Sequence, residues 1–250
     1  MIHSMRTLYF DIETAPKTIE EIERIAPPFN PDDVKHGNMS DPEKIAQKIE
    51  SERMAYLGDI HKKAALSPIY GKVVAIGVRI DSKTTILDCY KNPMQRGPES
   101  AGLIDFWSMV RCAEQIVGFN THHFDLPFLI KRSWQLGVNV PDCIIVPDKY
   151  RGRRMFSTMS VDLAEIWQLG DPLSRTKLDT IAKFLGIEGK TGDHGAHFAQ
   201  LWTSSNPEDR SQAVAYLEQD VALCEELHKR LKFASINLST LPKYIDQELP

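Results

Sequence analysis

Four carboxylates on three short stretches, far apart in the sequence, are the residues of this chain best suited to chemistry. Asp11 and Glu13 lie in the first stretch, Asp125 ends the second, and Asp220 follows Tyr216 by four residues in the third. Carboxylate oxygens are ligands that Mg²⁺ prefers. Two such ions bound side by side can activate a water and stabilise the leaving oxygen of a displacement at phosphorus. The set therefore suits phosphodiester cleavage with two Mg²⁺ or Mn²⁺ ions.

The spacing within each stretch supports this interpretation. Asp11 and Glu13 are two residues apart, so on a strand they share one face. Tyr216 and Asp220 are four apart, so on a helix they are neighbours. Because a phenol titrates far above neutral pH, we expect Tyr216 to orient the attacking water and not to act as its base. Taken singly, each residue has a simpler interpretation: solvated strand-end acids, a helix N-cap for Asp125 and a core aromatic for Tyr216.

Composition is that of an ordinary globular protein. The chain has 250 residues, of which 42% are hydrophobic, enough for one substantial core, so we expect a single domain over residues 1–250. No apolar run is long enough to span a bilayer, and no signal peptide is evident. The four cysteines show no CxxC pairing and indicate reduced thiols in a cytoplasmic protein. The net charge of −4 argues against a generic nucleic-acid coat protein but is compatible with a nuclease.

Apolar periodicity predicts the elements that position these residues. Near-continuous apolar character over 72–80 indicates a central, doubly covered strand. We expect further strands over 6–10, ended by Asp11, and over 84–90 and 115–119. Helices are expected over 99–112, from 126, over 178–185 and from 207, the last with Asn206 as N-cap. Residues 160–163 are expected to open a small helical lobe, and 17–70 to form an inserted helical arm with a helix from Pro42.

The three stretches, in this order, resemble a known family. Asp-Ile-Glu-Thr (11–14), Asn-x-x-x-Phe-Asp (120–125) and Tyr-x-x-x-Asp (216–220) are similar to the exonuclease motifs of the DEDD superfamily, in its tyrosine-bearing (DEDDy) branch. That branch contains the 3′–5′ proofreading domains of family B DNA polymerases. The resemblance implies a ribonuclease H-like α/β fold, with a mixed five-stranded sheet flanked by helices and a helical insertion after the first strand. It implies a stand-alone relative of the proofreading domain.

The resemblance also implies an activity and residue roles. The expected activity is a 3′–5′ exonuclease that releases nucleoside 5′-monophosphates from single-stranded DNA 3′ ends, with replication or repair proteins as candidate partners. An exoribonuclease of the same fold and a catalytically silent nucleic-acid-binding subunit are the alternatives. Side chains expected beside the terminal nucleotides are Thr14, Asn120 and Phe124. The expected metal ligands are Asp11, Glu13, Asp125 and Asp220, with Tyr216 orienting the water.

Several remaining residues have two interpretations. Arg151 and Arg153 belong to the densest basic cluster, which is either a solvated loop or a phosphate clamp to which Lys131 and Arg132 add. His122 and His123 are expected to flank the site. Trp107, Trp134 and Trp167 are expected to pack in the core. His194 and His197 lack the partners of a zinc site, so a structural or substrate-loop role is favoured.

Overall fold

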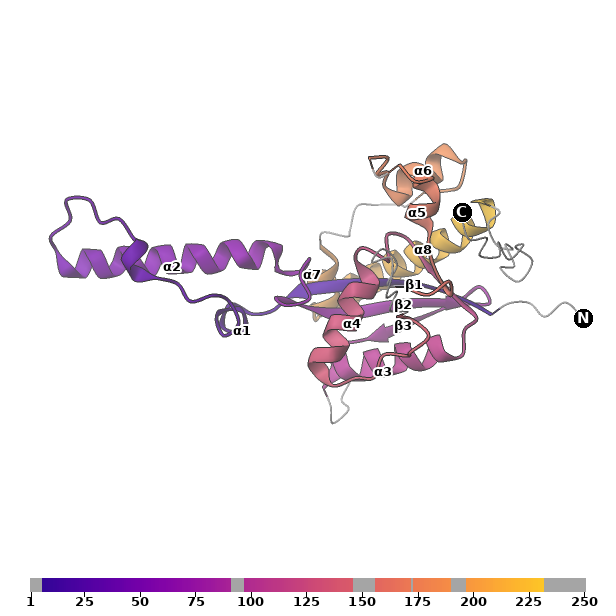
Figure 1. The fold of residues 1–250 in the computed structure, drawn as a ribbon, viewed down its shortest axis with the longest axis horizontal. Coiled ribbons are helices and arrows are strands. Elements are labelled where there is room, and N and C mark those ends of the chain that lie inside the picture. Colours follow the sequence, from indigo (N-terminus) through magenta and orange to yellow (C-terminus); the bar gives the residue numbers. More distant parts are fainter. Residues whose placement is uncertain (1–5, 91–96, 146–155, 172, 190–196, 232–250) are drawn as a thin grey trace, which may run out of the picture.

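The computed structural model describes residues 6–90, 97–145, 156–171, 173–189 and 197–231. Its centre is one five-stranded sheet in the order β3-β2-β1-β4-β5, with helices on both faces (Figure 1). The strands are β1 (Thr7–Pro16), β2 (Gly71–Ile80), β3 (Lys83–Asp88), β4 (Gln115–Gly118) and β5 (Ser160–Asp162). β1 pairs antiparallel with β2 and parallel with β4, and β4 pairs parallel with β5, so the expected mixed sheet is confirmed.

Two strand predictions were wrong. β1 does not end at Asp11 but continues to Pro16, because its later residues still pair with β2 and because Ile12 and Ala15 are buried. Residues 160–162 form the edge strand β5 before the helical lobe begins. A three-residue strand is too short to show a period of two in sequence, whereas in the fold its pairing with β4 defines it.

The two faces of the sheet carry different helices. On one face, α3 (Pro98–Arg111) and α4 (Asp125–Leu136) pack on Leu8, Phe10 and Ile76 in the largest hydrophobic core. On the other, α7 (Phe198–Thr203) and α8 (Pro207–Leu231) cover Ala75 and its neighbours. Asn206 caps α8 as expected, since its side chain accepts a hydrogen bond from the Glu208 N–H at 3.1 Å.

A small lobe of two short helices follows β5. α5 (Leu163–Gln168) begins directly after the strand, and α6 (Leu178–Phe184) follows it. Leu163 and Ile181 are buried and share a third hydrophobic cluster with Val117 of β4 and Leu227 of α8. The lobe therefore stands beside the C-terminal end of β4, near the start of α4.

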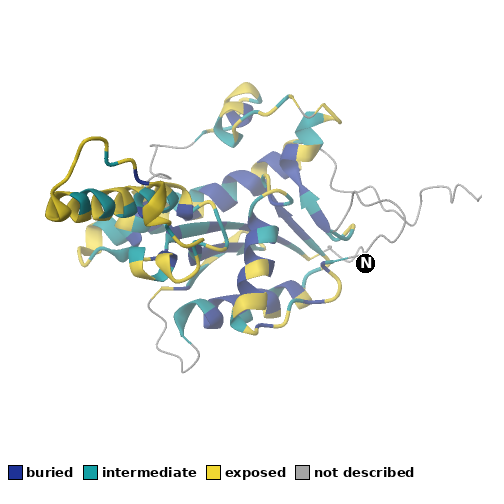
Figure 2. Cartoon of the chain, turned by 60° about the vertical axis from the view of Figure 1, so that its left-hand side comes forward, coloured by how far each residue is buried: buried dark blue, intermediate teal, exposed yellow. Residues whose placement is uncertain are grey.

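The segment between β1 and β2 forms an arm that projects from the sheet (Figure 1). It contains α1 (Ile19–Glu23), a 3₁₀ turn η1 (Pro31–Asp33) and α2 (Pro42–Ala64), whose N-cap is Asp41 as expected. Most of α2 is exposed (Figure 2), and its burial is concentrated near its C-terminal end, at Leu57 and Ala64. None of the helices in the described ranges is both long and apolar enough to cross a membrane.

The tryptophans divide between core and surface. Trp107 and Trp202 are fully buried, and Trp167 is half-buried in the third cluster. Trp134 was wrongly predicted to lie in the core: it is 62% exposed on α4. The helix buries Leu126, Leu129 and Ile130 instead, so the side of α4 that carries Trp134 faces away from the sheet.

Candidate functional site

Asp11 and Glu13 lie on the face of β1 that is directed toward α8. Leu8, Phe10 and Ile12 point into the α3/α4 core, so the alternating residues point the other way. Tyr9, on this second face, donates or accepts a hydrogen bond with His228 of α8. Asp11 and Glu13 continue the same alternation and therefore face α8 from the middle of the strand. Both acids lie on this face only because β1 continues past Asp11.

A glycine in β2, opposite Asp11, lets α8 pack close to the sheet. Gly77 of β2 is the register partner of Asp11. A Cβ at Gly77 would lie 2.8 Å from Leu217 Cγ and 3.0 Å from Val221 Cγ1, shorter than a van der Waals contact. Leu217 and Val221 are buried residues on either side of Asp220. The missing side chain at Gly77 thus sets the separation between Asp220 and the acids of β1.

Three of the predicted carboxylates converge. Asp11, Glu13 and Asp220 each offer one oxygen, and these atoms all lie within 4.8 Å of one another. Together with Tyr216 they line a cavity of about 250 Å³. Asp220 is buried at 4% exposure, while Asp11 and Glu13 are half-buried. Three close carboxylates repel one another, so a bound divalent cation would relieve the repulsion.

Asp125 approaches this group from the start of α4. It is the first residue of the helix, and Phe124 occupies the cap position, so the N-cap interpretation of Asp125 was wrong. Its Oδ1 accepts a hydrogen bond from the Ile12 N–H at 3.2 Å, which ties it to β1 between the two acids. Burial, followed by the charge of nearby Asp11, raises the pKa of Asp125 well above its usual value. Asp125 is not part of the group of three whose oxygens lie within 4.8 Å of one another, but it lines the adjoining larger pocket together with Asp11. Carboxylate oxygens are the donors that Mg²⁺ and Mn²⁺ prefer, so the three converging acids fit such an ion.

A larger pocket of about 800 Å³ opens beside the carboxylates. Asp11, Asp125 and Tyr216 line one part of it. Asn120 and Phe124, predicted to contact nucleotides, also line it, and Asn120 has a positive φ of 61°, which asparagine tolerates. Thr14 is not among the residues that line this pocket; its hydroxyl donates to the Ala65 carbonyl at 2.7 Å, at the base of the arm.

The same pocket is lined by cations that sequence reasoning missed. Arg175, Lys177 and Lys183 reach it from α6 and the residues before it, and Lys183 also pairs with Asp179 at 2.6 Å. Their only signal in the sequence is a basic spacing around a short helix, which is common on solvated surfaces. Arg151 and Arg153, chosen as the phosphate clamp, lie outside the described residues. Arg132 does not contribute to a clamp, because it is 3% exposed and ion-paired with Glu99 at 2.6 Å.

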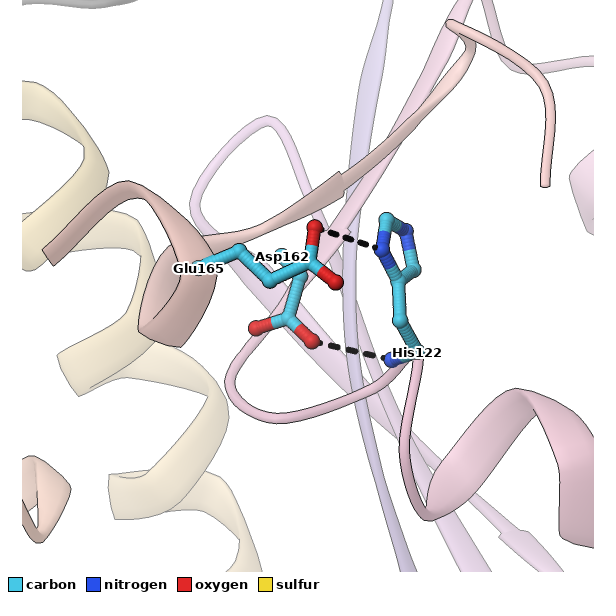
Figure 3. A group of neighbouring side chains, drawn as sticks. All are labelled: His122, Asp162 and Glu165. Carbon is cyan, nitrogen blue, oxygen red and sulfur yellow. Dashed lines mark hydrogen bonds and ion pairs between the residues drawn. The ribbon is translucent and has the colours of Figure 1, made fainter. Parts of the chain in front are cut away.

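Asp162, another residue that the sequence did not single out, fixes the turn between β4 and α4. Its carboxylate accepts hydrogen bonds from the N–H groups of Asn120 (2.8 Å), His122 (2.9 Å) and Ala164 (2.9 Å). Figure 3 shows this carboxylate beside the His122 backbone N–H, with the Glu165 side chain reaching the imidazole. Because Asn120 lines the larger pocket, Asp162 positions this side of the pocket.

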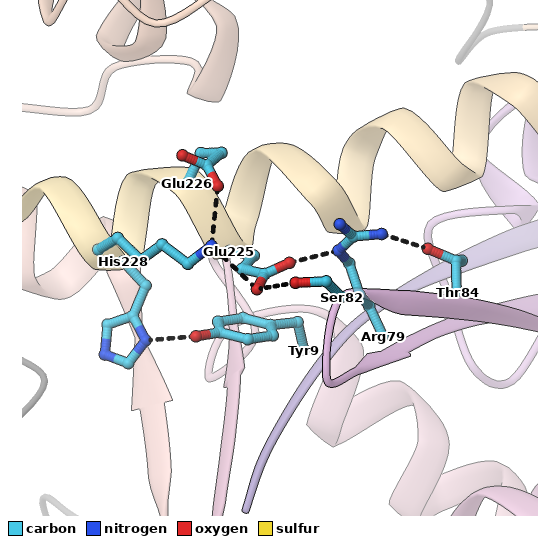
Figure 4. Close-up of polar contacts among 8 residues, drawn as sticks. Tyr9, Arg79, Ser82, Thr84, Glu225, Glu226 and His228 are labelled. Atoms are coloured by element: carbon cyan, nitrogen blue, oxygen red, sulfur yellow. Dashed lines mark hydrogen bonds and ion pairs between the residues drawn. The ribbon is translucent and has the colours of Figure 1, made fainter. Parts of the chain in front are cut away.

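A polar network fastens the second half of α8 to the sheet (Figure 4). Glu225 pairs with Arg79 of β2 and accepts from the Ser82 hydroxyl at 3.0 Å in the β2–β3 turn. His228 bonds Tyr9 of β1 at 3.1 Å. These contacts begin little more than one helical turn after Asp220, so they restrict the helix that carries it.

The comparisons with known proteins agree with this geometry. Residues 65–242 match a family model described as a predicted 3′–5′ exonuclease related to the exonuclease domain of PolB. The chain belongs to this family. The residues matched by the PolB-related exonuclease model include Asp125, Tyr216 and Asp220, whereas Asp11 and Glu13 precede them.

A solved structure supports the fold of this member of the family. The family B DNA polymerase from the hyperthermophilic archaeon Pyrobaculum calidifontis is similar at a TM-score of 0.55 and 20% sequence identity. The alignment covers 91% of this chain and 24% of the polymerase, so the chain spans about a quarter of that protein's length. The ribonuclease H-like α/β fold is thereby confirmed. A search among curated proteins found no match.

Proposed function

We propose that this chain is a metal-dependent 3′–5′ exonuclease that removes nucleoside 5′-monophosphates from the 3′ end of single-stranded DNA. Membership of the PolB-related exonuclease family supports nuclease activity. The observation that carries the proposal is the convergence of Asp11, Glu13 and Asp220 within 4.8 Å, from a strand and a helix some two hundred residues apart in the sequence. Three acids at that distance repel one another, and a bound divalent cation would offset this repulsion.

Asp11, Glu13, Asp125 and Asp220 would hold two Mg²⁺ or Mn²⁺ ions. When bound, such ions lower the pKa of a coordinated water and neutralise charge that develops on the phosphate and the leaving oxygen. The carboxylates are already placed for this by backbone contacts: Asp125 through the Ile12 N–H, and Asp11 through the β1–β2 register. Little rearrangement of the protein is then required when the ions bind.

Tyr216 is assigned to the attacking water. It lines both the small carboxylate cavity and the larger pocket, so its side chain lies where the two meet. One turn of α8 separates it from Asp220. The phenol hydroxyl hydrogen-bonds the water and fixes its line of approach to phosphorus, while the 3′ oxygen of the penultimate nucleotide leaves and takes up a proton.

The larger pocket is assigned to the 3′-terminal nucleotides. Phe124 offers a ring on which a base can stack, and Asn120 offers an amide at the exposed rim. Arg175 and Lys177 line the same pocket as Asp11 and Asp125, and they bind the phosphates of the strand. Removal of 3′-terminal nucleotides is the chemistry that proofreading and DNA repair require, and we assign the chain to that class of task.

The test is digestion of 5′-labelled single strands. Wild-type protein with Mg²⁺ or Mn²⁺ is expected to give a ladder that shortens from the 3′ end, and chelator is expected to stop it. Asp11→Asn is expected to abolish the ladder, whereas Glu218→Gln, an exposed acid on α8, serves as the matched control. DNA and RNA strands of one sequence are run in parallel.

Each outcome of this digestion decides a separate part of the proposal. Faster shortening of the RNA would overturn the DNA assignment and leave an exoribonuclease. Failure to cut either polymer with both metals would reject the enzyme and leave a nucleic-acid-binding subunit. Full activity of Asp11→Asn would remove the carboxylate site from the mechanism.

A further inference from the structure

A second pocket lies on the other side of the turn that shapes the active-site pocket. It has a volume of about 750 Å³ and is formed between α4 and the β5–α5 segment. Nothing in the proposed reaction uses it. Its walls include His122, Lys131, Trp134, Phe156, Ser160 and Glu165.

Flat aromatic side chains form part of the wall of this second pocket. The His122 ring stacks on Phe156, with centroids 5.0 Å apart and ring planes inclined by 26°. Trp134 is 62% exposed although tryptophan is the largest apolar side chain, and α4 gains no core packing from it. The exposed indole and the stacked imidazole–phenyl pair line the same pocket, and a nucleobase can stack on such rings because every base presents a π-face.

The polar groups of the second pocket hold the aromatic wall in place. His122 Nδ1 lies 3.0 Å from Glu165, and its Nε2 lies 2.9 Å from the Ser160 hydroxyl, so the imidazole is held at both nitrogens. The Asp162 carboxylate is directed at three backbone N–H groups and not at a ligand. Exposed Lys131 on the α4 wall supplies a cation for a phosphate.

The second pocket lies next to the active-site pocket, and neighbouring residues of the same two segments line one pocket or the other. His122 and His123 line the second pocket, whereas Asn120 and Phe124, on either side of them in sequence, line the first. Residues of α5 are also divided between the two pockets. Ala164 and Gln168 of α5 line the first pocket, and Glu165 and Ile166 line the second. One thin wall therefore separates the carboxylates' pocket from the aromatic one.

We propose that the second pocket binds a nucleobase of the substrate strand, on the 5′ side of the nucleotide that is removed. The inference rests on the proposed function and extends it: the protein grips single-stranded nucleic acid by stacking an upstream base on Trp134 and the His122–Phe156 pair. Stacking does not depend on base identity, so this grip favours single strands over duplexes without selecting a sequence.

The first experiment measures binding without cleavage. Asp220→Asn protein in chelator is titrated with a single-stranded DNA of about 12 nucleotides, and tryptophan fluorescence is followed. Quenching is expected, and it is expected to disappear in Asp220→Asn/Trp134→Ala. An otherwise matched series with one abasic nucleotide at each position from the 3′ end is expected to bind more weakly at one upstream position. A flat abasic series, or quenching that survives loss of Trp134, would overturn the proposal.

The second experiment measures cleavage on two substrates. The 4-nitrophenyl ester of thymidine 5′-monophosphate reaches only the active-site pocket, whereas the oligonucleotide reaches both. Trp134→Ala is expected to lower the ratio of kcat/KM for the oligonucleotide to kcat/KM for the ester by roughly 5- to 150-fold, the range for loss of one stacked base. Trp134→Phe is expected to restore most of the ratio. Tyr90→Ala, an exposed aromatic that lines neither pocket, is the control.

The outcomes separate the two proposals. If wild-type protein cuts neither substrate, the proposed function fails, and the fluorescence titration still decides the pocket. If the ester and the oligonucleotide are both cut and Trp134→Ala leaves their ratio at the wild-type value, the active-site assignment stands and the nucleobase site is rejected.

Discussion

Asp220→Asn is expected to stabilise the metal-free protein and to reduce the stabilisation that bound metal gives. Its carboxylate oxygen lies within 4.8 Å of oxygens from Asp11 and Glu13. Two unit charges at that distance repel by about 0.9 kcal/mol in bulk water and about 3.5 kcal/mol at an effective dielectric constant near 20. Since Asp11 and Glu13 are half-exposed and screened, we expect removal of the Asp220 charge to stabilise the metal-free fold by roughly 1 to 3 kcal/mol. For a chain of this size that corresponds to a Tm increase of roughly 2 to 12 °C.

Saturating metal is expected to stabilise wild-type protein more than the variant. A ligand at about 100 times its Kd stabilises the native state by about 2.7 kcal/mol, so wild-type protein is expected to gain roughly 5 to 11 °C in Tm. Asp220→Asn, lacking one ligand, is expected to gain less than half of that. Differential scanning calorimetry in chelator and in excess Mn²⁺ measures both shifts, with Glu218→Gln as a control that follows the wild type. The reasoning is refuted if Asp220→Asn is less stable than wild type in chelator, or if Mn²⁺ raises both Tm values equally.

Three further predictions follow from the elements around the site. Gly77→Ala is expected to push α8 away from β1 and to destabilise the fold by about 1 to 3 kcal/mol in urea unfolding. It is also expected to lower kcat at temperatures where the protein stays folded. An unchanged kcat would show that catalysis does not depend on the spacing between α8 and the sheet. Tyr216→Phe is expected to lower kcat at least about tenfold with little change in DNA affinity, and equal kcat values would remove the tyrosine from the mechanism. Burial raises the pKa of Glu225, but hydrogen bonds from Arg79, Lys229 and Ser82 outweigh it and lower the pKa overall. The stabilisation that ionised Glu225 gives is therefore present at neutral pH and lost as pH falls below about 4. Glu225→Gln is expected to unfold more easily at pH 7 and to lose less stability in acid than the wild type. Parallel profiles of unfolding free energy against pH for the two proteins would contradict this.

The sequence predicted the elements whose patterns are long. The apolar run of β2, the helical periodicity of α3 and the capped start of α8 were all recognisable, because burial on both faces or on one stripe leaves a repeating signal. β5 was missed because three residues cannot show such a repeat. The extension of β1 past Asp11 was missed because a charged residue directly after an apolar run resembles the end of a strand, whereas the pairing with β2 that continues the strand to Pro16 is a tertiary contact.

The candidate site likewise contains residues that the sequence predicted and residues that it did not. Asp11, Glu13 and Asp220 were found because their order and spacing form a recognisable combination, and the structure brings them together. Asp162 and the cations of the α6 region were not found, because their positions depend on how the lobe packs beside β4, which no local pattern encodes. The exposure of Trp134 is also tertiary information, since an aromatic on an amphipathic helix is more often buried.

Calorimetric titration with Mn²⁺ tests the central claim most directly, namely that distant acids form one metal centre. The account predicts two ions bound per wild-type chain, with affinity or stoichiometry reduced in each of Asp11→Asn, Asp125→Asn and Asp220→Asn but retained in Glu218→Gln. Wild-type protein that binds no Mn²⁺, or three carboxylate variants that bind it as the wild type does, would contradict it.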